Sequence, residues 1–126
     1  MSNYENTRIF LNFSNHPSSE WSAKQLKAAA GFGKVTDCPF PVIDPYADED
    51  AVRKLADEYV GRILSSHAAG LLTVHITGEH TFCFACVERL KQKGVTCLAS
   101  CSFRNDVTNP DGSTTKRFKF IQFRKY

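Results

Sequence analysis

The chain has 126 residues, of which 42% are hydrophobic and 23% are charged. This length is typical of one domain, so we expect a single domain over residues 1–126 and no separate regulatory module. The composition is that of a globular protein and argues against a disordered, collagen-like or membrane protein. Sixteen Lys and Arg against thirteen Asp and Glu leave a net charge of +3, which permits an anionic ligand but predicts no binding along a long nucleic acid.

The cysteines and the start of the chain indicate the compartment. There are five cysteines, Cys38, Cys83, Cys86, Cys97 and Cys101. An odd number, in a chain long enough to form its own core, is typical of reduced thiols in the cytosol. Their spacing matches no common zinc site, so we expect thiols packed in the core, and no metal or cofactor. The first fifteen residues carry Glu5 and lack the apolar core of a signal peptide. We therefore expect a cytoplasmic protein with no membrane partner.

The N-terminal part predicts a strand followed by a helix. Residues 8–13 are an apolar run, typical of a strand that is buried on both faces. Polar residues follow, and we expect Ser18 or Ser19 to cap a helix over about residues 20–30. We expect Gly31 and Gly33 to end this helix, because glycine adopts the left-handed conformation without steric cost.

A weak strand and a strong helix come next. Residues 34–38 predict the strand, and the prolines of residues 39–47 force a loop after it. Asp48 is the expected helix cap. After it, apolar residues recur at the spacing of one helix face: Val52, Leu55, Ala56, Tyr59 and Ile63.

The C-terminal half predicts strand, helix, strand and strand. Residues 71–77 are the clearest strand, and the helix over about residues 81–93 is ended by Gly94. Residues 95–103 predict a further strand, and a Pro-Asp-Gly turn leads into a terminal strand over residues 116–126. The apolar residues of that last strand break strict alternation, so we expect either a bulge or a strand covered on both faces.

The order of these elements predicts the fold class. Strands that alternate with helices form a parallel sheet with helices on both faces. We therefore expect a three-layer, Rossmann-like α/β fold with five strands in the order 2-1-3-4-5, mostly parallel, with an antiparallel C-terminal edge strand. Ligands of such sheets bind beyond the carboxyl ends of the strands, where the strand order reverses. Here that point lies between the first and the third strands.

Polar residues gather at this expected edge of the sheet. Hydroxyl, amide and backbone N–H groups there can bind a phosphate or a ribose, and the helix that follows the third strand directs its positive end toward the edge. The candidate ligand-binding residues are Asn12, Ser14, Gly78, Thr81, Ser100 and Ser102. The alternative is that Gly78 and Thr81 only form the turn and cap that a strand-to-helix connection needs.

The opening strand and turn, residues 10–17, resemble those of small CRISPR-associated proteins with a CARF-like, Rossmann-like fold. Some members of that group are ring nucleases, which cleave cyclic oligoadenylate second messengers in antiviral defence. The residues that carry the resemblance are Asn12, Ser14, His16 and Pro17. The Pro-rich segment 39–47 and the basic C-terminal strand depart from it.

The resemblance implies a metal-independent reaction in a homodimer. A ribose 2′-hydroxyl attacks the adjacent phosphodiester, so the enzyme supplies orientation and charge stabilisation. Arg104, Ser14 and the backbone after Gly78 suit the phosphate, whereas His16, His80 or Glu79 could be the base. A twofold symmetric ring fits a C₂ dimer.

Two other functions stay open. Glu79 at a strand end could serve a nucleoside N-glycosidase or deoxyribosyltransferase, with Asp37 or Asp44 as a second carboxylate. The chain could also be a non-catalytic module that sequesters a nucleotide. The alternative to a catalytic Glu79 is a carboxylate that is simply favoured in the positive first turn of a helix. His75, in its apolar strand, is expected to be a satisfied core histidine. Basic residues on the last strand are expected to prevent edge-to-edge aggregation.

Overall fold

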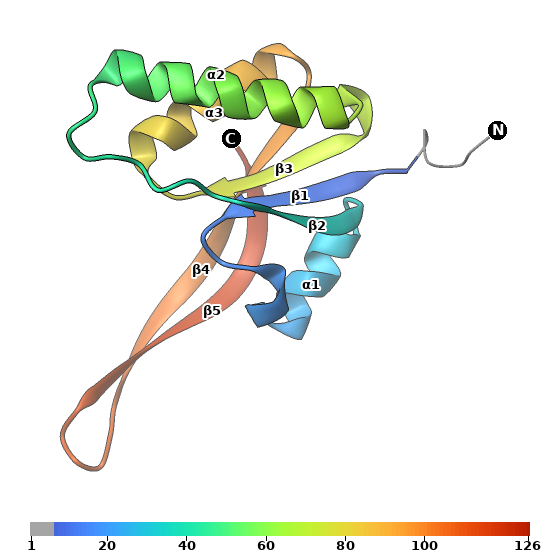
Figure 1. The fold of residues 1–126 in the computed structure, drawn as a ribbon. Coiled ribbons are helices and arrows are strands. Elements are labelled where there is room, and N and C mark those ends of the chain that lie inside the picture. The colour runs from blue at the N-terminus through green and yellow to red at the C-terminus, as the bar shows by residue number, and fades with distance from the viewer. Residues whose placement is uncertain (1–6) are drawn as a thin grey trace.

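The computed structural model describes residues 7–126; residues 1–6, with Glu5 of the expected N-terminal segment, lie outside the described part. The described chain alternates strands and helices (Figure 1). In chain order the elements are β1 (Ile9–Ser14), the 3-10 turn η2 (Ser18–Glu20), α1 (Ala23–Ala30), β2 (Lys34–Pro39), α2 (Glu49–Ser66), the 3-10 turn η3 (Ala69–Leu71), β3 (Leu72–Thr77), α3 (His80–Gln92), β4 (Thr96–Thr108) and β5 (Thr114–Lys125).

The five strands form one sheet in the order β2-β1-β3-β4-β5, as the sequence predicts. The first four strands run parallel and β5 is antiparallel to β4. Helices α2 and α3 cover one face, and α1 covers the other (Figure 1). The carboxyl ends of β1, β2 and β3 therefore share one edge, where residues Ser14, Pro39 and Thr77 are in register.

The helix boundaries confirm one predicted cap and correct another. Asp48 caps α2 by accepting a hydrogen bond from the backbone N–H of Ala51 at 2.9 Å. The first helix begins later than predicted because residues 18–20 form a 3-10 turn, and Ser22 is the cap in place of Ser18 or Ser19. Gly31 follows it in the right-handed conformation, so the left-handed end predicted there is wrong. Within residues 7–126, no helix is long and apolar enough to cross a membrane.

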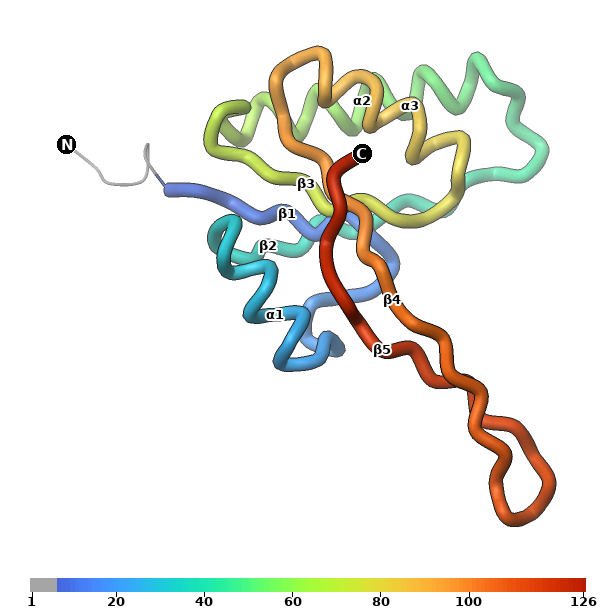
Figure 2. The backbone as a smooth tube through the Cα atoms, turned by 180° about the vertical axis from the view of Figure 1, so that it is seen from behind, coloured from blue at the N-terminus to red at the C-terminus, as the bar shows by residue number. Residues whose placement is uncertain are grey.

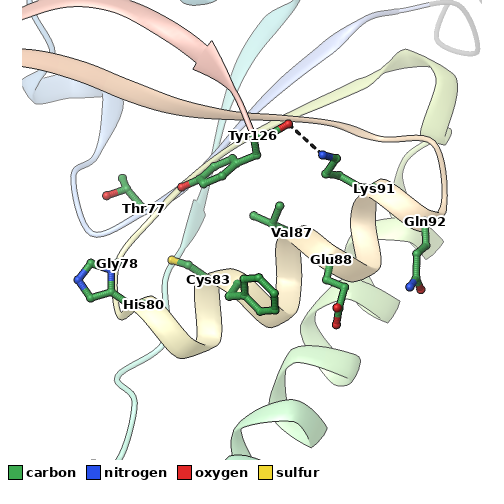
Figure 3. A pocket seen from close by; sticks show the side chains of 10 residues that line it. Thr77, Gly78, His80, Cys83, Val87, Glu88, Lys91, Gln92 and Tyr126 are labelled. Carbon is green, nitrogen blue, oxygen red and sulfur yellow. Dashed lines mark hydrogen bonds between the residues drawn. The ribbon is translucent and has the colours of Figure 1, made fainter.

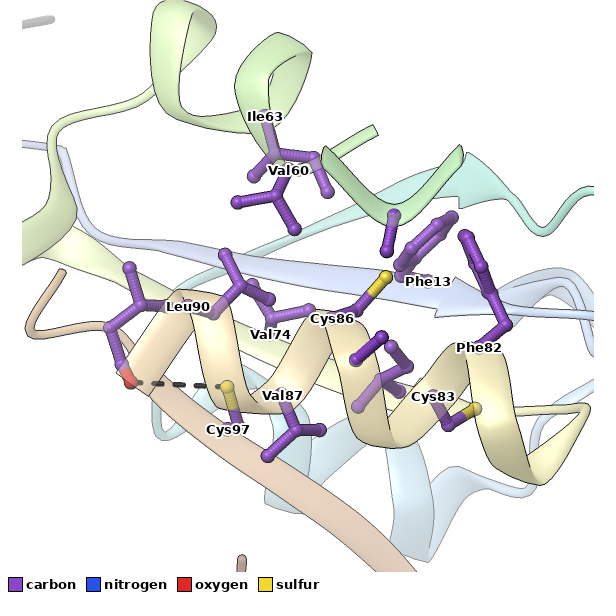
Figure 4. Close-up of a cluster of buried hydrophobic side chains, with 14 of the residues drawn as sticks. Phe13, Val60, Ile63, Val74, Phe82, Cys83, Cys86, Val87, Leu90 and Cys97 are labelled. Carbon is purple, nitrogen blue, oxygen red and sulfur yellow. Dashed lines mark hydrogen bonds between the residues drawn. The ribbon is translucent and has the colours of Figure 1, made fainter. Parts of the chain in front are cut away.

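Most of the core lies between the sheet and helices α2 and α3 (Figure 4). Phe13 and Val74 of the sheet meet Phe82 and Leu90 of α3 there, and all four are fully buried. A smaller cluster on the other face joins Phe10, Ala29 and Leu98. The two clusters fix the positions of β1 and β3, the strands at the centre of the sheet.

Cysteines contribute to the larger cluster as small apolar side chains. Burial raises the pKa of Cys83 to about 11 and that of Cys86 to about 12, so both thiols stay protonated at neutral pH. In the part of the chain that the structure describes, no cluster of His, Cys, Asp or Glu side chains could hold a metal ion.

Strands β4 and β5 continue far beyond the sheet as a two-stranded ribbon (Figures 1 and 2). β4 pairs with β3 only from Thr96 to Leu98, and from Ser102 onward it pairs only with β5. We call residues 102–120 the ribbon arm. At its base Cys101 pairs with Gln122 and Ser102 with Phe120, which leaves Ile121 as an extra residue. This is a β-bulge, one of the two alternatives that the broken alternation predicted.

The core position of Leu90 gives a first prediction. Leu90→Ala should lower the free energy of unfolding by about 2–5 kcal/mol, because it leaves a cavity beneath α3. Urea unfolding followed by circular dichroism measures this loss. Val42→Ala is the control, since the Val42 side chain is 96% exposed and its removal should change stability little. An equal effect of the two substitutions would contradict the assignment of the core.

Candidate functional site

A buried side chain, Asn12, organises the carboxyl edge of β1. Its amide nitrogen donates hydrogen bonds to Asp37 Oδ1 at 3.0 Å and to the His16 carbonyl at 2.8 Å. Its amide oxygen accepts bonds from Ser14 Oγ at 2.7 Å and His75 Nδ1 at 2.9 Å. Asn12 is 1% exposed, and these four bonds use its full hydrogen-bonding capacity. It therefore joins β1, β2, β3 and the turn after β1.

Further hydrogen bonds hold that turn in place. Ser14 Oγ accepts from the backbone N–H of His16 at 3.2 Å. Asp37 accepts from the backbone N–H of Ser18 at 3.2 Å and from its hydroxyl at 3.0 Å. The indole N–H of Trp21 donates to the His16 carbonyl at 3.2 Å. The turn from Ser14 to Ser18 is thus fixed over the ends of β1 and β2.

A cavity of about 290 Å³, which we call the edge pocket, lies at this turn. Its walls carry hydroxyl, amide and carboxylate groups from three segments, and Phe40 closes one side. The lining residues are Asn12, Ser14, Asn15, Pro17, Asp37, Cys38, Pro39 and Phe40. Such groups can donate to phosphate oxygens and accept from sugar hydroxyls.

The ring of Phe40 occupies the space at the end of β3. It packs on Phe13 and Phe82, with ring centroids 5.2 Å away in each case. A Cβ atom placed on Gly78 would lie 2.4 Å from the Phe40 ring, so only glycine permits this close approach. The crevice expected between β1 and β3 is thus filled here by a side chain, and the open cavity lies toward β2.

The start of α3 is capped by its own sequence. Glu79 accepts hydrogen bonds from the backbone N–H groups of Thr81 at 3.1 Å and Phe82 at 2.8 Å, and from the Thr81 hydroxyl. The bond from Phe82, then that from the Thr81 hydroxyl, lower the pKa of Glu79. Glu79 therefore occupies the N–H groups that the sequence analysis offered to a phosphate, and the capping role is supported.

Gly78 and His80 face a different cavity, which we call the α3 groove (Figure 3). This cavity of about 610 Å³ runs along α3 beside Tyr126 and is mainly apolar. The Tyr126 hydroxyl donates to the carbonyl of Ile76 at 2.9 Å, and Lys91 Nζ donates to the Tyr126 carbonyl at 3.0 Å. These bonds fix Tyr126 as one wall of the groove.

The candidates on β4 lie apart from the edge pocket. Ser100 pairs with Phe123, and Ser102 begins the ribbon arm. Arg104 is six residues beyond Leu98, about 20 Å along an extended strand. Its guanidinium lies 3.4 Å from Asp106 and 6.0 Å from the centre of the Phe118 ring. The predicted residues therefore form three groups, of which only Asn12 and Ser14 line the edge pocket, with His16 in the adjoining turn.

Two residues have larger roles than the sequence analysis gave them. Asp37, considered there only as a second carboxylate, pairs in register with Asn12 across β1 and β2. Its place near the carboxyl end of the predicted second strand could have indicated this role from the sequence. His75, expected to be a satisfied core histidine, bonds Asn12 through Nδ1, but its buried Nε2 has no protein partner among the described residues.

His75 is neutral in the folded protein. Asn12 Oδ1 can only accept, so His75 Nδ1 carries the proton of this bond. The imidazole is 2% exposed and packs against the rings of Phe10, Trp21 and Phe123. Burial, with a smaller effect of His16, lowers its pKa to about 4.

A comparison with protein families places the chain. The model of the family described as "Uncharacterized protein MJ1673 family" matches residues 8–124, which include all the helices and strands except the last residue of β5. The chain belongs to this family. None of the curated proteins compared with it matches. The family match covers Asn12, Ser14, His16 and Asp37, so the edge pocket lies within the part of the chain that defines membership.

The neutral buried imidazole predicts how stability depends on pH. Unfolded His75 binds a proton near pH 6.5 and folded His75 only near pH 4, so between these values the unfolded state holds more protons. Stability should therefore fall as the pH drops from about 6.5 to about 4, by about 3 kcal/mol from this group. NMR titration of the His75 ring protons should show no shift until about pH 4. A midpoint near 6.5 would contradict the assignment.

The cap of α3 gives a second prediction for this region. Glu79→Ala should lower the free energy of unfolding at pH 7 by about 1 kcal/mol, because two backbone N–H groups lose their partner. The folded pKa of Glu79 lies below its unfolded value, so this stabilisation is lost as the pH falls through the folded pKa. Urea unfolding at pH 7 and pH 3 measures both effects, with exposed Glu58→Ala as the control. A loss at pH 3 as large as that at pH 7 would contradict the carboxylate as its source.

Proposed function

We propose that the chain binds cyclic oligoadenylate at the edge pocket and cleaves it without a metal ion, as an antiviral ring nuclease. The observation that carries the proposal is the network around Asn12, which holds Ser14 and Asp37 in the lining of one cavity and fixes the backbone of His16 in the turn beside it. These include three of the four residues on which the resemblance to CARF-like ring nucleases rests. The family match itself names no activity.

The donor and acceptor groups of the pocket suit a nucleotide. Asp37 stands at the end of β2, the position from which an acidic residue accepts a ribose hydroxyl in many Rossmann-like sheets. Its Oδ2 accepts only the Ser18 hydroxyl among the described residues, so it has capacity for a second donor. Asn15 lines the same cavity and can donate to a phosphate, whereas the hydroxyl proton of Ser14 is engaged by Asn12 Oδ1. Ribose and phosphate would thus be held by neighbouring strands.

The reaction requires an aligned hydroxyl and one base. The ribose 2′-oxygen forms a bond to phosphorus, the bond from phosphorus to the 5′-oxygen breaks, and a 2′,3′-cyclic phosphate remains. His16 takes the 2′-hydroxyl proton, and the departing 5′-oxygen takes a proton from water. The His16 backbone is held by Asn12, Ser14 and Trp21, while the residue itself is exposed at the rim between two lining residues.

Two earlier candidates fit this proposal poorly. Glu79 is engaged in capping α3, which also weakens the glycosidase alternative that depends on its carboxylate. Arg104 lies on the ribbon arm, so it reaches the pocket of its own chain only if the arm bends. A C₂ homodimer, which suits the twofold symmetry of cyclic tetra-adenylate, would bring a second edge pocket to the ring.

A module that binds the messenger without cleaving it is the second candidate. The observation in its favour is the composition of the edge pocket, whose lining residues include no Lys, Arg or His among those described. Charge that develops on a phosphorane is stabilised mainly by fixed donors and cations. Slow cleavage, or none, is the expectation if no cation arrives from a partner.

The test is incubation with cyclic tri-, tetra- and hexa-adenylate in EDTA, with products separated by liquid chromatography and identified by mass spectrometry. Linear products that end in a cyclic phosphate are expected. His16→Ala should slow their formation about 10²- to 10⁴-fold, because the base is removed. His67→Ala, a histidine at the far end of α2, should leave the rate unchanged.

The remaining outcomes separate the alternatives. Intact rings that stabilise the protein against heat would indicate a module that only sequesters the messenger. Intact rings without any thermal shift would refute both forms of the proposal and favour the glycosidase. Cleavage that His16→Ala and His67→Ala reduce equally would refute the role of His16.

A further inference from the structure

The positive charge of the chain is concentrated in one element. Strands β4 and β5 with their turn, residues 96–125, carry six Lys and Arg against two Asp. Their net charge of +4 exceeds that of the whole chain, since the other residues hold ten cations against eleven anions. The weak overall charge therefore conceals a strongly basic ribbon.

A groove runs between this ribbon and the face of the molecule that carries α1. It encloses about 860 Å³ and is separate from the edge pocket and the α3 groove. We call it the ribbon groove. One wall comes from η2 and α1, with Glu20, Trp21, Ser22, Lys24 and Gln25. The other comes from the ribbon arm, with Ser102, Phe103, Asn105, Arg117, Phe118, Lys119 and Phe120.

Exposed aromatic rings mark the arm wall. The Phe118 side chain is 70% exposed and Phe103 is 62% exposed. Phe118 shares a face of the ribbon with Ser102 and Phe120, and this face leads to the buried rings beside Trp21. A two-stranded ribbon alone is marginally stable in water, so exposed rings on it suggest a surface that becomes covered.

The cations of the groove have no ion-pair partner within residues 7–126. Among the described residues, Lys24, Arg117 and Lys119 form no ion pair, and Glu20 is the single acidic residue of the lining. Arg104, on the same face as Phe118, is paired only with exposed Asp106. The groove is therefore complementary to an anion that also presents flat apolar surfaces.

We propose that the ribbon groove binds a linear single-stranded nucleic acid. Unpaired bases stack on Phe118, and Lys24, Arg117 and Lys119 contact the phosphates, which is the combination that single-strand binding surfaces use. The lining of the groove combines cations from α1 and from the arm with the exposed ring of Phe118. This site is separate from the edge pocket and does not depend on the ring-nuclease proposal.

A second copy of the chain is a poorer occupant. Two ribbons that meet about a twofold axis would bring two sets of unpaired cations together, and like charges across an interface oppose association. The phosphates of a nucleic acid strand supply the negative charge that balances the cations of the arm. The test nevertheless includes the oligomeric state as an outcome.

The test uses the full chain and fluorescein-labelled 12-nucleotide A and U RNAs, with fluorescence anisotropy at several salt concentrations. Binding should weaken linearly in log Kd against log salt, with a slope of about 0.7 per phosphate contacted. Phe118→Ala should weaken binding at least about 5-fold, the lower end of one lost base stack. Lys119→Ala should reduce the salt slope by about 0.7.

Matched controls make the result specific. Phe84 on α3 is 69% exposed, nearly as much as Phe118, but lies outside the ribbon groove. Phe84→Ala and the exposed Lys93→Ala should leave RNA affinity within 2-fold of the parent chain. Equal losses in Phe84→Ala and Phe118→Ala would overturn the proposal, as would the absence of binding at 50 mM salt.

Two further outcomes would also overturn it. Displacement of the labelled RNA by cyclic tetra-adenylate at stoichiometric amounts would make the groove part of the ring site. A dimer, measured by light scattering, that Phe118→Ala dissociates without any RNA binding would make the ribbon an interface between copies. Ring cleavage is expected to be the same in Phe118→Ala and in the parent chain, so failure here leaves the proposed function untouched.

Discussion

The carboxyl edge of this sheet depends on one amide. Asn12 is the point at which three strands and a turn are tied together, because its two donors and two acceptor positions all have protein partners. A buried amide with any of these bonds missing would carry a desolvation cost of about 1–3 kcal/mol. The same bonds that satisfy it therefore force Asp37, Ser14 and the His16 carbonyl to converge. The polar groups of the edge pocket are thus positioned by an amide buried inside the sheet.

Phe40 determines which part of the edge is open. The loop after β2 turns its ring onto Gly78 and between Phe13 and Phe82, so the reversal point of the strand order is apolar and closed on that side. Glu79 has a similar effect on the start of α3, whose first N–H groups it satisfies. The edge pocket stays open toward β2, and two larger grooves lie elsewhere, one along α3 and one beside the ribbon arm.

The sequence predicted the fold well because its strongest signals are local. Apolar runs, the Asp48 cap and the glycine after α3 define the elements, and alternating strands and helices leave few topologies. The site was harder to predict. Residues close in the chain, such as Asn12, Ser14 and His16, do gather, whereas separating Ser100 and Arg104 from them required knowing that β4 leaves the sheet. The contact of the Phe40 ring with Gly78 is a tertiary contact, and neither residue type predicts it from the sequence.

The bulge at Ile121 determines which face of β5 each side chain occupies on either side of it. In a regular strand Phe120 and Phe123 would point to opposite faces, but the extra residue puts them together, with ring centroids 4.8 Å apart. The bulge thus shifts the alternation of inward and outward side chains by one residue between the two segments of β5. It makes the face that is core at Phe123 continuous with the face that carries Phe118 in the arm. Loss of one residue at this point would leave the pairing possible and exchange the inner and outer surfaces of the whole arm.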